Sequence, residues 1–211
     1  MILPRLYPIL DVGLLEARGC PVDGAAEAIF AAGAGILQWR CKRNPGEADM
    51  LLLERVVAAC RRGGARLIVN DRADIARMFG SGLHLGQDDL PAAAARRVVG
   101  SEASIGLSTH NEEQVRAAAA EPVDYIAIGP VFSTVSKQNP DPVVGLGNLR
   151  AWSALTSLPV VAIGGITTAS ARDVLDHGAA SVAVIGGLYP DPCTPASIER
   201  RVKEWLNLLC A

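Results

Sequence analysis

The sequence lacks the features that would place the chain in a membrane or on a nucleic acid. It contains no run of about 18 uninterrupted apolar residues, the length that a transmembrane helix requires. Residues 1–11 are apolar but short, contain Arg5, and lack the basic head and long apolar stretch of a signal peptide. The formal net charge is −2, which gives no support for a polyanionic partner. We therefore expect neither a membrane nor a nucleic acid as partner, and the sequence does not indicate an oligomeric state.

Patterns typical of disulfides or cysteine-bound metals are also missing. The cysteines number five, an odd count, and none lie in a CxxC pair. A chain of 211 residues, half of them apolar, is large enough to bury a core without disulfides. We expect reduced thiols, a cytoplasmic protein, and a single domain over residues 1–211.

Short apolar runs rich in β-branched residues recur along the chain and alternate with alanine-rich stretches of helical spacing. Such alternation predicts βαβ units and a parallel sheet. Eight runs favour a (β/α)₈ barrel of the TIM type, and the absence of GxGxxG after the first run weighs against an open doubly wound sheet. The runs are Leu6–Asp11, Ile36–Lys42, Arg66–Asp71, Leu83–Gln87, Ser104–Ser108, Tyr125–Val131, Val160–Gly165 and Ser181–Gly186.

Polar residues collect at the ends of these runs, where parallel barrels form their active sites. Strand alternation puts Gln38, Arg40 and Lys42 on one face, a group suited to a pyrophosphate. An exposed strand end with salt-bridged cations would look the same. Trp39 and Cys41 should face the helix layer, which favours packing over nucleophilic chemistry for Cys41.

Carboxylates follow the next two runs. Asp71 ends the third, and Asp88 and Asp89 follow the fourth. Two carboxylates from adjacent strand exits suit Mg²⁺, which prefers oxygen ligands. The alternative is a salt-bridge cluster with the neighbouring cations, and position alone does not choose between Asp88 and Asp89.

Two further residues leave open alternatives at the fifth run. Ser108 either binds a ligand or caps the following helix. His110 is a candidate acid or base, although a structural role at a helix start is the simpler interpretation. His84, inside a strand, is expected to be a core or wall residue.

Loops at the last three strand exits suggest a lid and an anion site. The segment from Gly129 to Asn148 is long, polar and rich in proline and glycine, as in a lid over charged ligands. The pairs Gly164-Gly165 and Gly186-Gly187 follow the seventh and eighth runs. Glycines there expose backbone N–H groups, which predicts a phosphate site.

Together these pieces resemble the thiamine-phosphate synthase family over nearly the whole chain. The matching motifs are Gln38-x-Arg40-x-Lys42, Asn70-Asp71-Arg72-x-Asp74, His84-Leu85-Gly86-Gln87-x-Asp89, Gly106-x-Ser108-x-His110, Asp124-Tyr125 with Gly129-Pro130-Val131-Phe132, Thr134-x-Ser136-Lys137, and Ala162-Ile163-Gly164-Gly165-Ile166. The resemblance implies a transferase that joins an aminopyrimidine diphosphate to a thiazole phosphate and releases pyrophosphate through a pyrimidine carbocation.

The resemblance also implies the site residues. The pyrimidine diphosphate would be bound by Gln38, Trp39, Arg40, Cys41, Lys42, Asn70, Ser108 and Lys137, with Arg40, Lys42 and Lys137 catalytic, Asp71 and Asp89 holding Mg²⁺, and Thr134, Val135, Ser136, Gly165, Ile185 and Gly186 holding the thiazole phosphate. Ser136 replaces the family's usual threonine, and Gly186 its usual serine. The alternatives are a thiazole tautomerase-like isomerase using a histidine such as His110, and a phosphate-binding barrel without catalysis.

Overall fold

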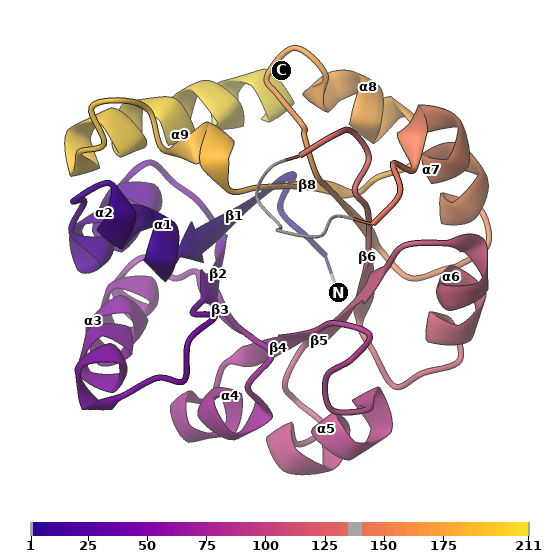
Figure 1. Cartoon of the computed structure of the whole chain (residues 1–211), viewed down its shortest axis with the longest axis horizontal. Helices are drawn as coiled ribbons and strands as arrows, with labels where there is room; N and C mark the ends of the chain where they lie inside the picture. The colour runs from indigo at the N-terminus through magenta and orange to yellow at the C-terminus, as the bar shows by residue number, and fades with distance from the viewer. Residues whose placement is uncertain (1, 135–140, 211) are drawn as a thin grey trace.

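A computed structural model describes residues 2–134 and 141–210, and it confirms the predicted (β/α)₈ barrel. Eight strands pair in parallel and in chain order, and β1 closes the ring against β8. The helices surround the ring, as Figure 1 shows. The strands are β1 (Leu6–Asp11), β2 (Ile36–Arg40), β3 (Arg66–Asn70), β4 (Gly82–Leu85), β5 (Ile105–Thr109), β6 (Tyr125–Ile128), β7 (Val160–Ile163) and β8 (Ser181–Val184). The helices are α1 (Val12–Ala17), α2 (Val22–Ala31), α3 (Glu47–Arg62), α4 (Ala73–Phe79), α5 (Ala92–Val99), α6 (Glu112–Ala118), α7 (Gly145–Ser153), α8 (Ala171–Asp176), the 3₁₀ turn η1 (Gly186–Leu188) and α9 (Pro195–Cys210).

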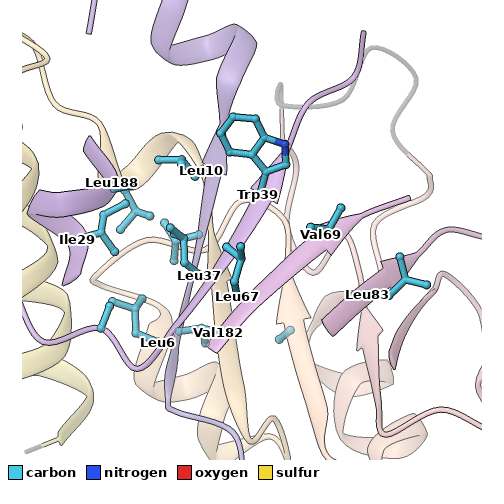
Figure 2. Packing of buried hydrophobic residues seen from close by; sticks show 14 of the residues in the cluster. Leu6, Leu10, Ile29, Leu37, Trp39, Leu67, Val69, Leu83, Val182 and Leu188 are labelled. Atoms are coloured by element: carbon cyan, nitrogen blue, oxygen red, sulfur yellow. The ribbon is translucent and has the colours of Figure 1, made fainter. Parts of the chain in front are cut away.

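Strand alternation divides the core into two layers. In β2, Leu37 and Trp39 point outward and pack among buried residues between the strands and the helices (Figure 2). Ile36 points inward, where it joins Tyr7 and Tyr125 in a smaller cluster that fills the barrel interior. The inward positions further along β2 to β5 are polar, whereas those of β6 to β8 stay apolar. The same periodicity that builds the core therefore delivers polar side chains to the barrel mouth.

Most of the expected strands extend one to three residues beyond the C-terminal ends of the observed strands. β2 ends at Arg40 and β4 at Leu85, because the chain leaves the sheet where its polar residues begin. The long loop is also shorter than expected, since α7 begins at Gly145 rather than after Asn148. Two glycines in the first turn of α7, Gly145 and Gly147, mask its helical character in the sequence.

No helix in residues 2–134 or 141–210 is long and apolar enough to cross a membrane. All five cysteines fall within the described residues and are free thiols.

Candidate active site

The second strand exit carries three polar side chains into the barrel mouth. Gln38, Arg40 and Lys42 all line one cavity, as their alternation predicts. The guanidinium of Arg40 forms an ion pair with Asp11 at the end of β1. Lys42 Nζ lies 2.7 Å from Asp71 Oδ2. The two cations are therefore held apart by carboxylates from the strands on either side of β2.

Asp11 orients Arg40 and also starts the first helix. Its Oδ1 accepts a hydrogen bond of 2.9 Å from the Leu14 backbone N–H and so caps α1, while Oδ2 receives Arg40. This ion pair is largely buried, with side-chain exposures of 20% for Arg40 and 13% for Asp11. The sequence reasoning missed Asp11, although its position at a strand end, on the inward face shared with Ile9, was a usable signal.

A third cation, Arg43, fixes the loop that follows Lys42. Its guanidinium contacts Glu16 with bonds of 2.6 and 2.7 Å, and Asp49 with bonds of 2.5 and 3.3 Å. These hydrogen bonds lower the pKa of both carboxyl groups. Asp49 also accepts the Gly46 N–H at 3.0 Å. The loop between β2 and α3 is thereby tied to α1, which fixes the backbone on which Lys42 stands.

The carboxylates predicted to hold a metal lie side by side. Burial raises the pKa of Asp89, and the adjacent Asp71 carboxylate raises it further. Asp89 Oδ2 accepts the Gly86 N–H at 2.6 Å, whereas Asp88 is exposed at the rim. Asp71 has φ +66°, the left-handed region that side chains other than glycine rarely adopt. This costly backbone conformation directs the Asp71 carboxylate toward Asp89.

The oxygen donors of this pair fit a hard divalent cation. Across residues 2–134 and 141–210, no three His, Cys, Asp or Glu side chains are grouped to hold a metal. Two carboxylates suit Mg²⁺, which keeps waters and takes phosphate oxygens of a substrate as further ligands. Among the described residues, Lys42 and the Gly86 N–H offset the repulsion between the two carboxylates, and a cation between them would be favourable.

Asn70 and Ser108 stand above the cavity floor. Asn70 is 8% exposed, and its Nδ2 finds no hydrogen-bond partner among the described residues. A buried donor of this kind costs free energy unless a ligand accepts from it. Ser108 does not cap α6, because the Asn111 side chain does so by accepting from Gln114 N. Ser108 Oγ instead lies 2.9 Å from His84 Nε2.

The opposite side of the cavity is built from glycines. Gly164 and Gly165 follow β7 with φ of +99° and +65°. A Cβ on Gly164 would lie 2.5 Å from Pro130 Cβ, and one on Gly165 would lie 2.4 Å from the Ser133 carbonyl oxygen. Only glycine therefore permits the loops after β6 and β7 to lie against each other. At Gly186 a Cβ would meet nothing within 4 Å, so that position is open.

These pieces surround one cavity of about 700 Å³ at the C-terminal ends of the strands. The expected site residues that line it are Gln38, Arg40, Lys42, Asn70, Asp71, Asp89, Ser108, Thr134, Gly165, Ile185 and Gly186. The side chains of Trp39 and Cys41 do not line it; both pack toward the helix layer, because alternate residues face away from the barrel axis. Val135, Ser136 and Lys137 lie outside the described residues.

The cavity also includes residues that the sequence reasoning did not single out for binding. Tyr7 and Tyr125 form its floor, and His84 its wall. His110 lines it as well, with Nδ1 2.6 Å from the Gly129 carbonyl oxygen and 3.6 Å from an Asp141 carboxylate oxygen. Inward alternation in β1 and β6 was the available signal for the tyrosines, but apolar neighbours made them look like ordinary core residues.

Comparison with known proteins agrees with this geometry. Residues 6–188 match the model of a family described as thiamine monophosphate synthase. The chain belongs to this family. A thiamine-phosphate synthase of Koribacter versatilis is 46% identical over 210 residues, which cover 98% of this chain and 96% of that protein. A thiamine-phosphate synthase of Chloroflexus aurantiacus is 38% identical over 199 residues, which cover 93% of this chain and 91% of that protein.

A solved structure shows the same family relationship in three dimensions. The thiamine phosphate pyrophosphorylase from Pyrococcus furiosus superposes with a TM-score of 0.81 at 29% identity, covering 97% of this chain and 95% of that chain. Membership in the thiamine monophosphate synthase family confirms the resemblance and the class of enzyme, a transferase, that the motifs predicted.

Proposed function

We propose that this chain joins 4-amino-2-methyl-5-(diphosphooxymethyl)pyrimidine to 4-methyl-5-(2-phosphoethyl)thiazole, or to its carboxylated form, and releases pyrophosphate and thiamine phosphate. The observation that carries the proposal is the set of residues that line the cavity at the barrel mouth. A cluster of cations and carboxylates from β2, β3 and β4 faces a glycine-built surface from β7 and β8. Two reactants, each bearing phosphate, require two such sites within reach of each other.

The charged half suits the departing pyrophosphate. Arg40 and Lys42 would hold its oxygens and stabilise the charge that builds up as the carbon–oxygen bond breaks. The unpartnered Nδ2 of Asn70 offers a further donor. Lys137, outside the described residues, is proposed to act with them. Asp71 and Asp89 would hold Mg²⁺, which when bound neutralises phosphate charge as a Lewis acid.

No protein nucleophile is needed in this reaction. The electron-rich pyrimidine supports a carbocation at its methylene carbon, and the thiazole nitrogen captures it. Cys41, the cysteine closest in sequence to the site, has its side chain directed at the helix layer. The chain would act by positioning both reactants and by excluding water, for which the loop after β6 is the proposed lid.

The glycine half is the proposed thiazole phosphate site. Thr134, Gly165, Ile185 and Gly186 line the cavity there, and Val135 and Ser136 would complete the site. We also propose that the partners are these small molecules, with no nucleic acid or membrane partner. A cytoplasmic location accords with the five free thiols.

The direct test is an assay of the purified protein with both substrates and Mg²⁺. The expected product is thiamine phosphate, together with one pyrophosphate per turnover, and omission of Mg²⁺ should abolish it. Folding is checked separately by circular dichroism. Folded protein that forms no product at any Mg²⁺ concentration would contradict the proposal.

The alternative function is that of a thiazole tautomerase-like isomerase, and the observation in its favour is that His110 lines the cavity. A tautomerase would need this imidazole for proton transfer, whereas the synthase reaction would not. His110→Ala should therefore retain substantial synthase activity. Loss of all activity by a folded His110→Ala protein would favour the isomerase.

A further inference from the structure

The cavity floor contains a continuous chain of hydrogen bonds between two of the expected binding residues. Gln38 Nε2 donates to Tyr7 Oη at 3.2 Å, and Tyr7 Oη lies 2.7 Å from Tyr125 Oη. Tyr125 Oη lies 3.1 Å from His84 Nδ1, and His84 Nε2 lies 2.9 Å from Ser108 Oγ. Five side chains from β1, β2, β4, β5 and β6 thus form one path across the barrel.

The middle of this path is sealed from solvent. Tyr7 is 1% exposed, Tyr125 is fully buried and His84 is 7% exposed. Among the described residues, the hydroxyl and ring-nitrogen partners of these three side chains are all neutral groups, and burial without a charged partner favours the neutral form of each. A neutral imidazole has one donor and one acceptor nitrogen. Among the described residues, Tyr7 Oη bonds only Gln38 and Tyr125, so a Tyr7 hydroxyl that accepted from both would leave its own hydrogen buried without an acceptor. All the buried groups are satisfied only when every link in the path points the same way.

The donor at one end fixes that direction. Because Gln38 Nε2 donates to Tyr7, Tyr7 donates to Tyr125 and Tyr125 donates to His84 Nδ1. The imidazole proton then resides on Nε2 and is donated to Ser108 Oγ. The side-chain carbonyl oxygen of Gln38 is then the acceptor that faces a ligand, and the hydroxyl hydrogen of Ser108 is the donor that faces it. Reversal of one end alone would leave a buried hydroxyl hydrogen without an acceptor, so the satisfied arrangement reverses at all its links together.

We infer that Tyr7, Tyr125 and His84 form a positioning relay that sets the donor and acceptor orientation of Gln38 and Ser108 and thereby selects a 4-aminopyrimidine over a 4-oxopyrimidine. An amino group donates to the Gln38 oxygen. An oxo group would face that oxygen, acceptor against acceptor, unless the whole relay reversed. The inference rests on the proposed function, which supplies the pyrimidine.

The position of Tyr125 in this relay explains a glycine. A Cβ on Gly106 would lie 2.0 Å from the Tyr125 ring, so β5 has no side chain where the ring crosses it. The ring also stacks on His84, with centroids 5.7 Å apart and planes at 27°. Glycine at position 106 of β5 thus leaves room for Tyr125, the central residue of the relay.

The first test reads the tautomer of His84 directly. Nitrogen-15 NMR of the whole protein distinguishes Nε2–H from Nδ1–H imidazoles, and the His84 signal is assigned by its loss in His84→Gln. Wild-type protein should show the Nε2–H tautomer, and Tyr125→Phe should shift it toward a mixture. A wild-type Nδ1–H tautomer would overturn the inferred direction. This result does not depend on catalysis, so failure of the relay and failure of the proposed function are distinguishable.

The second test reads selectivity. Calorimetry in Mg²⁺-containing buffer compares binding of 4-amino-2-methyl-5-(diphosphooxymethyl)pyrimidine with that of its 4-oxo analogue. Tyr7→Phe and Tyr125→Phe should each reduce the preference for the amino compound by roughly tenfold, the equivalent of one hydrogen bond. The matched control is Tyr189→Phe, which removes a buried hydroxyl bonded to the Ile9 carbonyl oxygen, outside the relay. Equal loss of affinity for both compounds, or the same change in Tyr189→Phe, would mean a merely structural role.

Discussion

The two halves of the cavity are built from different parts of the polypeptide. The half formed by β2, β3 and β4 uses charged side chains that are already paired, such as Lys42 with Asp71. The half formed by β7 and β8 uses backbone, with glycines such as Gly164 and Gly165 in left-handed conformations. The first half depends on which side chains are present, whereas the second depends on which side chains are absent.

This difference predicts how each half responds to substitution. Substitution at the carboxylate pair of the charged half should reduce activity without reducing stability, because Asp71 and Asp89 repel each other. The glycine half should lose stability and affinity together, since an added Cβ displaces the neighbouring loop. Position 186 is the exception, because its surroundings are open.

The largest effect is expected at the carboxylate pair. Asp89→Asn should reduce kcat/KM by on the order of 100-fold or more, because it removes a charged ligand of the proposed Mg²⁺ site. Its unfolding temperature should not fall, since the substitution relieves repulsion from Asp71. Steady-state kinetics over a range of Mg²⁺ concentrations measure this effect. Asp88→Asn, at the exposed neighbour, is the control, and equal losses in the two variants would refute the choice of Asp89.

The next largest effect is expected at Gly164, where the loops after β6 and β7 approach each other closely. Gly164→Ala should lower the free energy of unfolding by about 1–3 kcal/mol, because φ is +99° and the new Cβ would meet Pro130. The KM for the thiazole phosphate should rise about tenfold with the shift of the loop. Denaturant unfolding and kinetics check the two parts. Gly147→Ala, in the open face of α7, should cause neither change.

The contrast also explains what could be predicted from the sequence. Side-chain chemistry follows strand alternation, so Gln38, Arg40 and Lys42 could be placed in the mouth from their spacing alone. Contacts between side chains of different strands could not, because no local pattern shows that Asp11 meets Arg40 on the neighbouring strand or that Tyr7 meets Tyr125 across the barrel. Gly164 and Gly165 could be recognised as a loop, but their contacts with Pro130 and Ser133 depend on how two loops pack.

The choice between Asp88 and Asp89 shows the same limit. Both follow β4, and alternation fails once the chain has left the strand. In the structure the Gly86 N–H holds the Asp89 carboxylate near Asp71 while Asp88 stays exposed, which supports Asp89 as the proposed metal ligand. That hydrogen bond depends on the geometry of the turn after β4 and cannot be predicted from the types of residue present.

A smaller effect tests whether the charged half also needs its supporting loop. Arg43→Ala should lower the free energy of unfolding by about 1 kcal/mol and raise the KM for the pyrimidine diphosphate a few-fold, since Lys42 loses its fixed backbone. Arg43 lowers the pKa of Glu16 and Asp49, so its stabilisation is present above their ordinary values, about pH 4, and is lost as the pH falls through the lowered values.

The measurement is denaturant unfolding of both proteins at several pH values. The difference between wild type and Arg43→Ala should be largest near neutrality and should shrink below about pH 4. Arg55→Ala, which breaks an exposed ion pair with Asp23, is the control with little expected change. A difference that stays constant with pH would show that Arg43 acts through packing rather than through its carboxylate partners.

The smallest effect is a gain, and it sharpens the comparison most. Gly186→Ser adds the hydroxyl usual in the family at a position where a Cβ meets nothing within 4 Å. One extra hydrogen bond to the thiazole phosphate should lower its KM by roughly two- to tenfold, with kcat unchanged. Gly187→Ser is the counterpart, because its Cβ would lie 3.1 Å from a Val184 methyl carbon and offers no such gain. If Gly186→Ser leaves the KM unchanged, the backbone N–H groups alone satisfy the phosphate, and the glycine half is complete without side-chain hydroxyls at this position.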